Sequence, residues 1–148
     1  MRLKGIRKEF AAWGVPPPDV VDYPFVREDH EDFVSRNFDR IAKGNYTFVM
    51  AANDRLAKSI LLAARRRNLR IPGDFSLSGV DDSPFCRDLN LTTVSLHSMD
   101  LGLAALELLK RRLFMPESHA EPEKVLVPCP LIVRNTTGKI TGEIFNEK

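Results

Sequence analysis

One stretch of the 148-residue chain, residues 48–82, constrains its fold more than any other. An apolar run, Phe48–Ala52, is followed by a helical spacing of apolar residues that ends near Asn68, and a second apolar run covers Phe75–Val80. The order strand, helix, strand predicts a βαβ unit with parallel strands. Because strands and helices alternate along most of the chain, we predict an α/β domain with a mostly parallel sheet flanked by helices.

Polar residues follow both strands of this unit at the point where each strand ends. Asn53-Asp54 comes after the first apolar run and Asp81-Asp82 after the second. Ligands of open parallel sheets bind at the carboxyl edge of the strands. Amide and carboxylate groups offer paired acceptors and a few donors, which suits the hydroxyls of a small polyol. We therefore expect a polyol-binding edge.

The remaining elements are predicted from apolar periodicity and from proline and glycine positions. The spacing of Leu3, Ile6, Phe10 and Trp13 predicts a helix over 2–13, with Trp13 in the core rather than stacked on a sugar. The other predicted elements are a strand at 19–25, a helix from Glu28 to Lys43, a strand at 91–96, a helix at 99–113 and short strands at 125–127 and 131–133. The polar tail from Asn135 is expected to fray.

Two other interpretations of the acidic residues have to be weighed against ligand binding. Asp54, Asp81 and Asp82 could form a catalytic set or a metal site, but no histidine lies at a useful spacing beside them, so we predict no enzyme, no cofactor and no metal. Asn53 or Asp54 could instead cap the following helix, and Asp81-Asp82 could be a solvated turn.

A basic run, Arg65–Arg67 with Arg70, allows two interpretations. A solvated helix face is the simpler one, and a phosphate or DNA contact is the alternative. The net charge of +2 gives no support for a nucleic-acid or membrane surface. Cys86 and Cys129 fit a reducing compartment, although sequence alone leaves a disulfide open. With no apolar stretch behind Met1, we expect a cytoplasmic protein.

Four strings resemble, in order and spacing, the C-terminal half of the effector domain of LacI/GalR-family bacterial transcriptional regulators. They are AANDRLA (51–57), RIPGDFSLSGVDDSP (70–84), LTTVSLHSMDLGLAALELL (91–109) and VPCPLIVRNTTG (127–138). The run Arg2–Gly5 resembles the family's R-x-x-G helix start. The resemblance implies a periplasmic-binding-protein-like (type I) fold, here essentially one lobe with closing segments over 1–138 and a polar tail over 139–148.

The same resemblance implies a function and a set of ligand contacts. It implies a cytoplasmic homodimer that senses a sugar-like effector and binds operator DNA through a headpiece outside this chain. Arg2, Asn53 and Asp81 match the family's effector-contacting arginine, amide and carboxylate, while Asp54 is expected to cap or brace the helix. Phe25 and Arg27 lie near a position that is often aromatic. Ser98 stands where some members carry a phenylalanine, which implies a wider or more polar pocket.

Two further expectations follow. In the family, the helix after LTTV is covered by the first lobe, so here its apolar face, which includes Leu101, Ala104 and Leu108, has to find another partner. We predict that the chain self-associates or folds this helix back on its own sheet. The alternative function is a solute-binding protein of a sugar transporter, which shares the fold.

Overall fold

The computed structural model describes residues 2–23, 29–114 and 123–139. A four-stranded sheet in the order β1-β2-β3-β4 forms its centre. Its strands are β1 (Phe48–Met50), β2 (Ser76–Asp81), β3 (Thr92–Ser95) and β4 (Leu131–Ile132). The first three pair in parallel and β4 pairs antiparallel with β3. The predicted α/β class with a mostly parallel sheet is confirmed.

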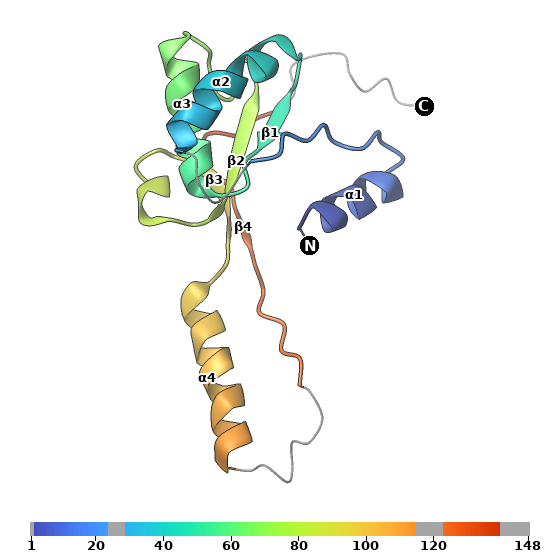
Figure 1. Cartoon of the computed structure of the whole chain (residues 1–148), viewed down its shortest axis with the longest axis vertical. Helices are drawn as coiled ribbons and strands as arrows, with labels where there is room; N and C mark the ends of the chain where they lie inside the picture. The colour runs from blue at the N-terminus through green and yellow to red at the C-terminus, as the bar shows by residue number, and fades with distance from the viewer. Residues whose placement is uncertain (1, 24–28, 115–122, 140–148) are drawn as a thin grey trace.

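Two helices cover one face of this sheet and form the core with it (Figure 1). They are α2 (His30–Lys43) and α3 (Asp54–Arg66), close to the predicted bounds. The Asp29 carboxylate starts α2 by accepting the Glu31 N–H over 2.9 Å. Apolar residues from α2, α3 and β2 are buried together, among them Phe33, Phe38, Leu56, Ile60, Leu61 and Leu77. This core fixes β1 and β2 relative to the start of α3.

The last long helix, α4 (Ser98–Phe114), extends away from the sheet beside the segment that returns to β4 (Figure 1). None of its residues is buried. The prediction that this helix folds back on its own sheet is therefore wrong. The physical reason is that α4 starts just past the end of β3 and continues beyond the edge of the sheet, so its side chains do not meet either face of the sheet (Figure 1).

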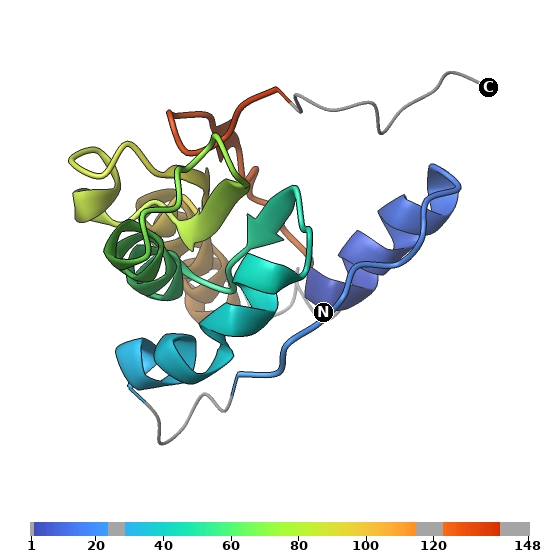
Figure 2. The ribbon, with the colours of Figure 1, turned by 90° about the horizontal axis from the view of Figure 1, so that it is seen from above.

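The N-terminal helix, α1 (Arg2–Ala12), forms as predicted but buries none of its residues. Trp13 is 81% exposed, so its predicted place in the core is wrong. The chain that follows, Pro16–Pro18, is extended and leads away from α1, which lies to one side of the sheet, away from α2 and α3 (Figure 2).

Two predicted strands do not form in the described residues, and each has an identifiable reason. The described part of the expected strand, 19–23, is not a strand, because Asp19 is instead held by the side chains of Arg40 and Tyr46. The expected strand at 125–127 is absent, and Pro128 and Pro130 follow it without N–H donors.

The expected fraying from Asn135 is also wrong for residues 135–139. The Thr136 hydroxyl donates to the Leu77 carbonyl over 2.8 Å and accepts the Thr92 N–H over 2.8 Å. The Thr136 carbonyl accepts the Leu77 N–H over 2.7 Å. Thr136 is 4% exposed, so this closing segment is part of the folded lobe.

Candidate functional site

The carboxyl ends of β1 and β2 meet at one edge of the sheet. Met50 is paired with Ser78 across the two strands. Asn53 and Asp81 each lie three residues beyond that pair, so the two polar positions predicted from sequence are level with each other. Asp81 is in turn paired with Ser95 of β3, and Ser98 lies three residues further along. This edge is the candidate site.

Asn53 has a structural task at this edge. Its side-chain oxygen accepts the Leu56 N–H over 2.8 Å, which caps α3. The capping interpretation is thus confirmed for Asn53, whereas the alternative that Asp54 caps the helix is wrong. Because the oxygen is engaged, the amide nitrogen is the group that Asn53 can offer to a ligand.

Arg2 reaches the same edge from α1. Its Nη1 donates to the carbonyl of Ala52 over 2.6 Å, next to Asn53. Burial, followed by the charge of Asp54, raises the pKa of Asp81, while the charge of Arg2 lowers it. A guanidinium, an amide and a carboxylate from three separate parts of the chain therefore lie at one edge, a set that can bind hydroxyl or anionic oxygens.

The other predicted ligand contacts either lie further from this edge or fall outside the described ranges. Ser98 is the first residue of α4 and is exposed. Phe25 and Arg27 lie outside the described residues. Two hollows of about 200 and 260 Å³ open elsewhere on the lobe, and no predicted site residue lines either one.

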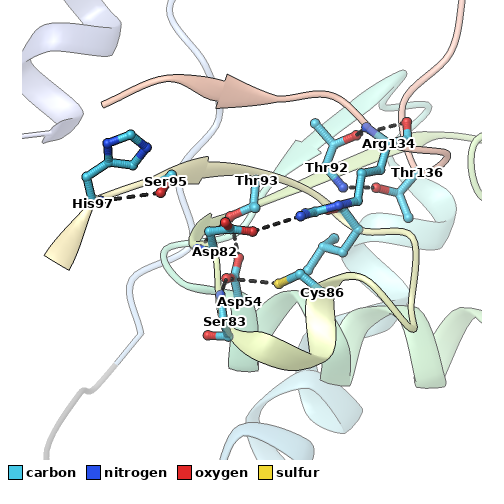
Figure 3. Close-up of polar contacts among 11 residues, drawn as sticks. Asp54, Asp82, Ser83, Cys86, Thr92, Thr93, Ser95, His97, Arg134 and Thr136 are labelled. Atoms are coloured by element: carbon cyan, nitrogen blue, oxygen red, sulfur yellow. Dashed lines mark hydrogen bonds and ion pairs between the residues drawn. The ribbon is translucent and has the colours of Figure 1, made fainter. Parts of the chain in front are cut away.

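A buried network supports this edge from below (Figure 3). The Asp54 carboxylate accepts hydrogen bonds from Thr93 Oγ1 over 2.6 Å, the Ser83 N–H over 2.8 Å and Cys86 Sγ over 3.0 Å. Asp82 pairs with Arg134, Nη2 to Oδ1, over 2.9 Å. The solvated-turn interpretation is therefore wrong for Asp82.

Thr93 and Arg134 are members of this network that no sequence pattern singles out, and Cys86 stands out in the sequence only as one of two thiols. Arg134 lies within the VRNTT run, but nothing local in the sequence indicates that it contacts Asp82. Cys86 and Cys129 are both free thiols. Burial, followed by the hydrogen bond to Asp54, raises the pKa of Cys86 to about 12, so its thiol stays protonated and unreactive at neutral pH.

The basic run forms a solvated face, as the simpler interpretation predicts. Arg65–Arg67 are exposed, and two of them contact acids on α2, Arg66 with Glu31 and Arg67 with Asp39, both over 3.6 Å. Arg70 pairs with Asp74 over 2.8 Å. Exposed pairs of this kind contribute little to stability.

Within the described ranges, no group of three or more His, Cys, Asp or Glu side chains could hold a metal ion. No helix in that part of the chain is long and apolar enough to cross a membrane.

Comparison with known proteins decides the family. The model of the periplasmic binding protein-like domain matches residues 1–137. The chain belongs to this family. It corresponds to part of the effector domain of LacI-family transcriptional regulators. Those relatives are named as transcriptional regulators, in line with the expectation of a non-enzymatic protein.

Three similar proteins illustrate the match. The transcriptional regulator DegA of Bacillus subtilis is 29% identical over 143 residues, which is 94% of this chain and 41% of DegA. A LacI-family regulator of Enterococcus faecium with bound ribose has a TM-score of 0.77 at 24% identity, covering 95% of this chain and 51% of that one. The regulator CelR in complex with cellobiose has a TM-score of 0.75 at 26% identity, covering 91% of this chain and 41% of CelR. The chain spans less than half the length of the curated relatives it matches.

Proposed function

We propose that this chain is the effector-binding lobe of a LacI-family transcriptional regulator and that it binds a sugar at the edge formed by Arg2, Asn53 and Asp81. The observation that carries the proposal is the hydrogen bond from Arg2 to Ala52, which brings a guanidinium beside an amide and a carboxylate. Ribose and cellobiose, bound by similar regulators, present the vicinal hydroxyls that such a set can hold.

Each side chain has a distinct role in this proposal. The Asp81 carboxylate accepts hydrogen bonds from two hydroxyls, the Asn53 amide nitrogen donates one, and Arg2 donates to a ring or hydroxyl oxygen. Ser98 contributes a further hydroxyl from the start of α4, and we keep Phe25 and Arg27 as proposed contacts. Residues 1–138 form the functional unit, with 139–148 as a polar tail.

The regulatory part of the proposal concerns the whole protein. Sugar binding changes the affinity for operator DNA, which is contacted by a headpiece outside this chain in a cytoplasmic homodimer. A solute-binding protein of a transporter shares the fold, but the curated relatives named as transcriptional regulators favour the regulator.

The proposal is tested by titrating the ¹⁵N-labelled chain with ribose, cellobiose, a sugar phosphate and a purine, following amide shifts by NMR. NMR detects millimolar binding, which suits a single lobe. One sugar is expected to shift the amides around 52–54 and 81–83. Asp81→Ala and Arg2→Ala should abolish these shifts, and Asp88→Ala, an exposed carboxylate beyond the site, should preserve them. Shifts that survive both site variants would contradict the proposal.

A further inference from the structure

Asp54 is a fully buried carboxylate that directly follows Asn53 of the candidate ligand edge. It is 0% exposed and accepts three hydrogen bonds, each from a different part of the lobe. Thr93 belongs to β3, Ser83 follows β2, and Cys86 belongs to the short 3-10 helix η1 (Pro84–Cys86) (Figure 3). A buried carboxylate is costly unless its oxygens are satisfied, and here each oxygen has at least one donor.

The backbone directly above Asp54 is strained. Asp81 has φ +120° and Asp82 has φ +53°, in the region that residues with a β-carbon seldom adopt. Two such residues in succession persist only where surrounding contacts hold them. Asp82 itself is contacted by the Thr93 hydroxyl and by Arg134, and directly after it the Ser83 N–H donates to Asp54 Oδ2.

Gly79 shows how closely β2 approaches this carboxylate. A β-carbon at Gly79 would collide with Asp54 Oδ1, and the Asp54 Cα would lie 3.2 Å from it. Only glycine allows β2 to pass over Asp54 at this distance. The carboxylate therefore sits directly beneath the last residues of β2, from which Asp81 projects.

We propose that Asp54 is a positioning residue for effector binding: through Ser83 and Thr93 it holds the Asp81–Asp82 bend in the strained conformation that presents the Asp81 carboxylate at the ligand edge. This inference rests on the proposed function. Thr93 links Asp54 to the bend, because its hydroxyl donates to Asp54 over 2.6 Å and accepts the Asp82 N–H over 3.4 Å. Without Asp54, the bend relaxes and the Asp81 carboxylate leaves the position that the sugar hydroxyls need.

Asp54 also acts on Asp81 through its charge. Two carboxylates near each other repel, and the Asp54 charge disfavours ionised Asp81. Hydroxyl donors from a ligand relieve that repulsion, so the pair favours ligands that donate to Asp81. Asp54 thus favours hydroxyl-bearing ligands through its effect on Asp81, although Asp54 itself is buried and touches no ligand.

The test uses Asp54→Asn, which keeps the size of the side chain, and Asp88→Asn as the matched control on an exposed carboxylate. The first readout needs no ligand. In Asp54→Asn, one amide oxygen without charge replaces the two carboxylate oxygens that serve three donors, so the Ser83 hydrogen bond is weakened. Hydrogen exchange of the Ser83 amide should then accelerate on the order of tenfold relative to the Leu77 and Val80 amides of β2, since a weakening of about 1.4 kcal/mol is a factor of ten. A uniform acceleration of all these amides would show a merely structural role and overturn the proposal.

The second readout is the affinity for ribose and cellobiose in a double-mutant cycle with Asp81→Asn. Asp54→Asn should weaken binding on the order of tenfold alone and add almost nothing in the Asp81→Asn background. Additive losses would overturn the positioning role. If Asp81→Asn leaves affinity unchanged, or neither sugar binds, the proposed sugar site fails, and the Ser83 exchange result alone then decides whether Asp54 holds the bend.

A second variant guards against a folding defect in Asp54→Asn. Thr93→Val removes one hydroxyl donor to Asp54 while keeping the side-chain volume. It should reproduce the faster Ser83 exchange and the weaker binding, with a smaller amplitude. Normal Ser83 exchange in a folded Thr93→Val protein would contradict the role given to Thr93.

Discussion

Arg134 Nη2 donates to Asp82 Oδ1 over 2.9 Å, and these residues are 52 positions apart in the chain. The same guanidinium donates from Nη1 to the Leu91 carbonyl over 2.7 Å. The two side chains are 14% and 24% exposed, so the pair is shielded from water. It ties the closing segment of the lobe to the strained bend after β2.

Arg134→Met should destabilise the chain by about 1–3 kcal/mol, because the Asp82 carboxylate and the Leu91 carbonyl then lose their donor in a shielded position. Urea unfolding followed by circular dichroism measures the change. Lys139→Met, on an exposed lysine five residues later, serves as control and should stay within about 0.5 kcal/mol of wild type. Equal losses in both variants would mean that the pair contributes nothing.

Thr136→Val should cost about 1–3 kcal/mol of unfolding free energy, since it leaves the buried Leu77 carbonyl and Thr92 N–H without their hydroxyl partner. Valine keeps the volume, so the loss reports on hydrogen bonding rather than on a cavity. Asn135→Ala, one residue earlier and exposed, is expected to change little. A neutral Thr136→Val would restore the expectation of a fraying tail.

Two substitutions at Asn53 separate its capping role from its proposed ligand contact. Asn53→Asp keeps an oxygen for the Leu56 N–H and should leave stability near wild type, yet weaken sugar binding because the amide donor is gone. Asn53→Ala should lose about 1 kcal/mol of stability as well. Thermal unfolding and the NMR titration distinguish the two effects, and normal binding by Asn53→Asp would remove Asn53 from the site.

Asp81→Asn should stabilise the chain at neutral pH. The folded-state pKa of Asp81 is raised above 3.8 by burial and then by the Asp54 charge, so the folded state binds the proton more tightly than the unfolded state. Wild-type stability therefore falls as pH rises from 3.8 through the folded pKa. The gain in Asp81→Asn should be present at pH 7 and vanish at about pH 3, where both states are protonated. A gain that is the same at both pH values would refute the linkage.

The chain should self-associate through α4. Its large exposed side chains are Met99, Leu101, Leu103, Leu106, Leu109, Leu113 and Phe114, each at least 48% exposed. Light scattering after size exclusion should show an apparent mass that rises with concentration above 16.8 kDa. Leu103→Gln with Leu106→Gln should lower the mass toward the monomer, whereas Glu107→Gln should not. A concentration-independent monomer would end this prediction.

The elements with a strong local pattern were predictable from sequence. The helix α3 and the strands β1 and β2 follow from apolar periodicity and from the polar breaks at Asn53 and near Asn68, because local spacing decides which face is buried. The polar positions after β1 and β2 were also predictable, since parallel strands bring their carboxyl ends to one edge.

The network beneath the edge could not be predicted, because its contacts join residues far apart in sequence. Asp54 meets Thr93 across 39 positions, and Thr136 meets Leu77 across 59. Only the folded sheet shows which of several threonines is buried. The failures at Trp13 and at 19–23 have a related cause, since an apolar pattern predicts a face but not whether anything covers it.

The helix α4 and the segment that returns to β4 are linked to each other both near the sheet and at their far end. At the sheet, the Ser95 N–H donates to the Pro130 carbonyl over 2.9 Å, and at the far end Arg111 pairs with Glu123 over 3.1 Å. A helix attached to the sheet by a single segment could rotate about any axis. Here α4 and the returning segment are linked to each other at both ends, so together they resist twisting and sliding and bend about one axis. We therefore expect a force on the far end of α4 to bend this arm where it joins the sheet, at Ser95, the register partner of Asp81.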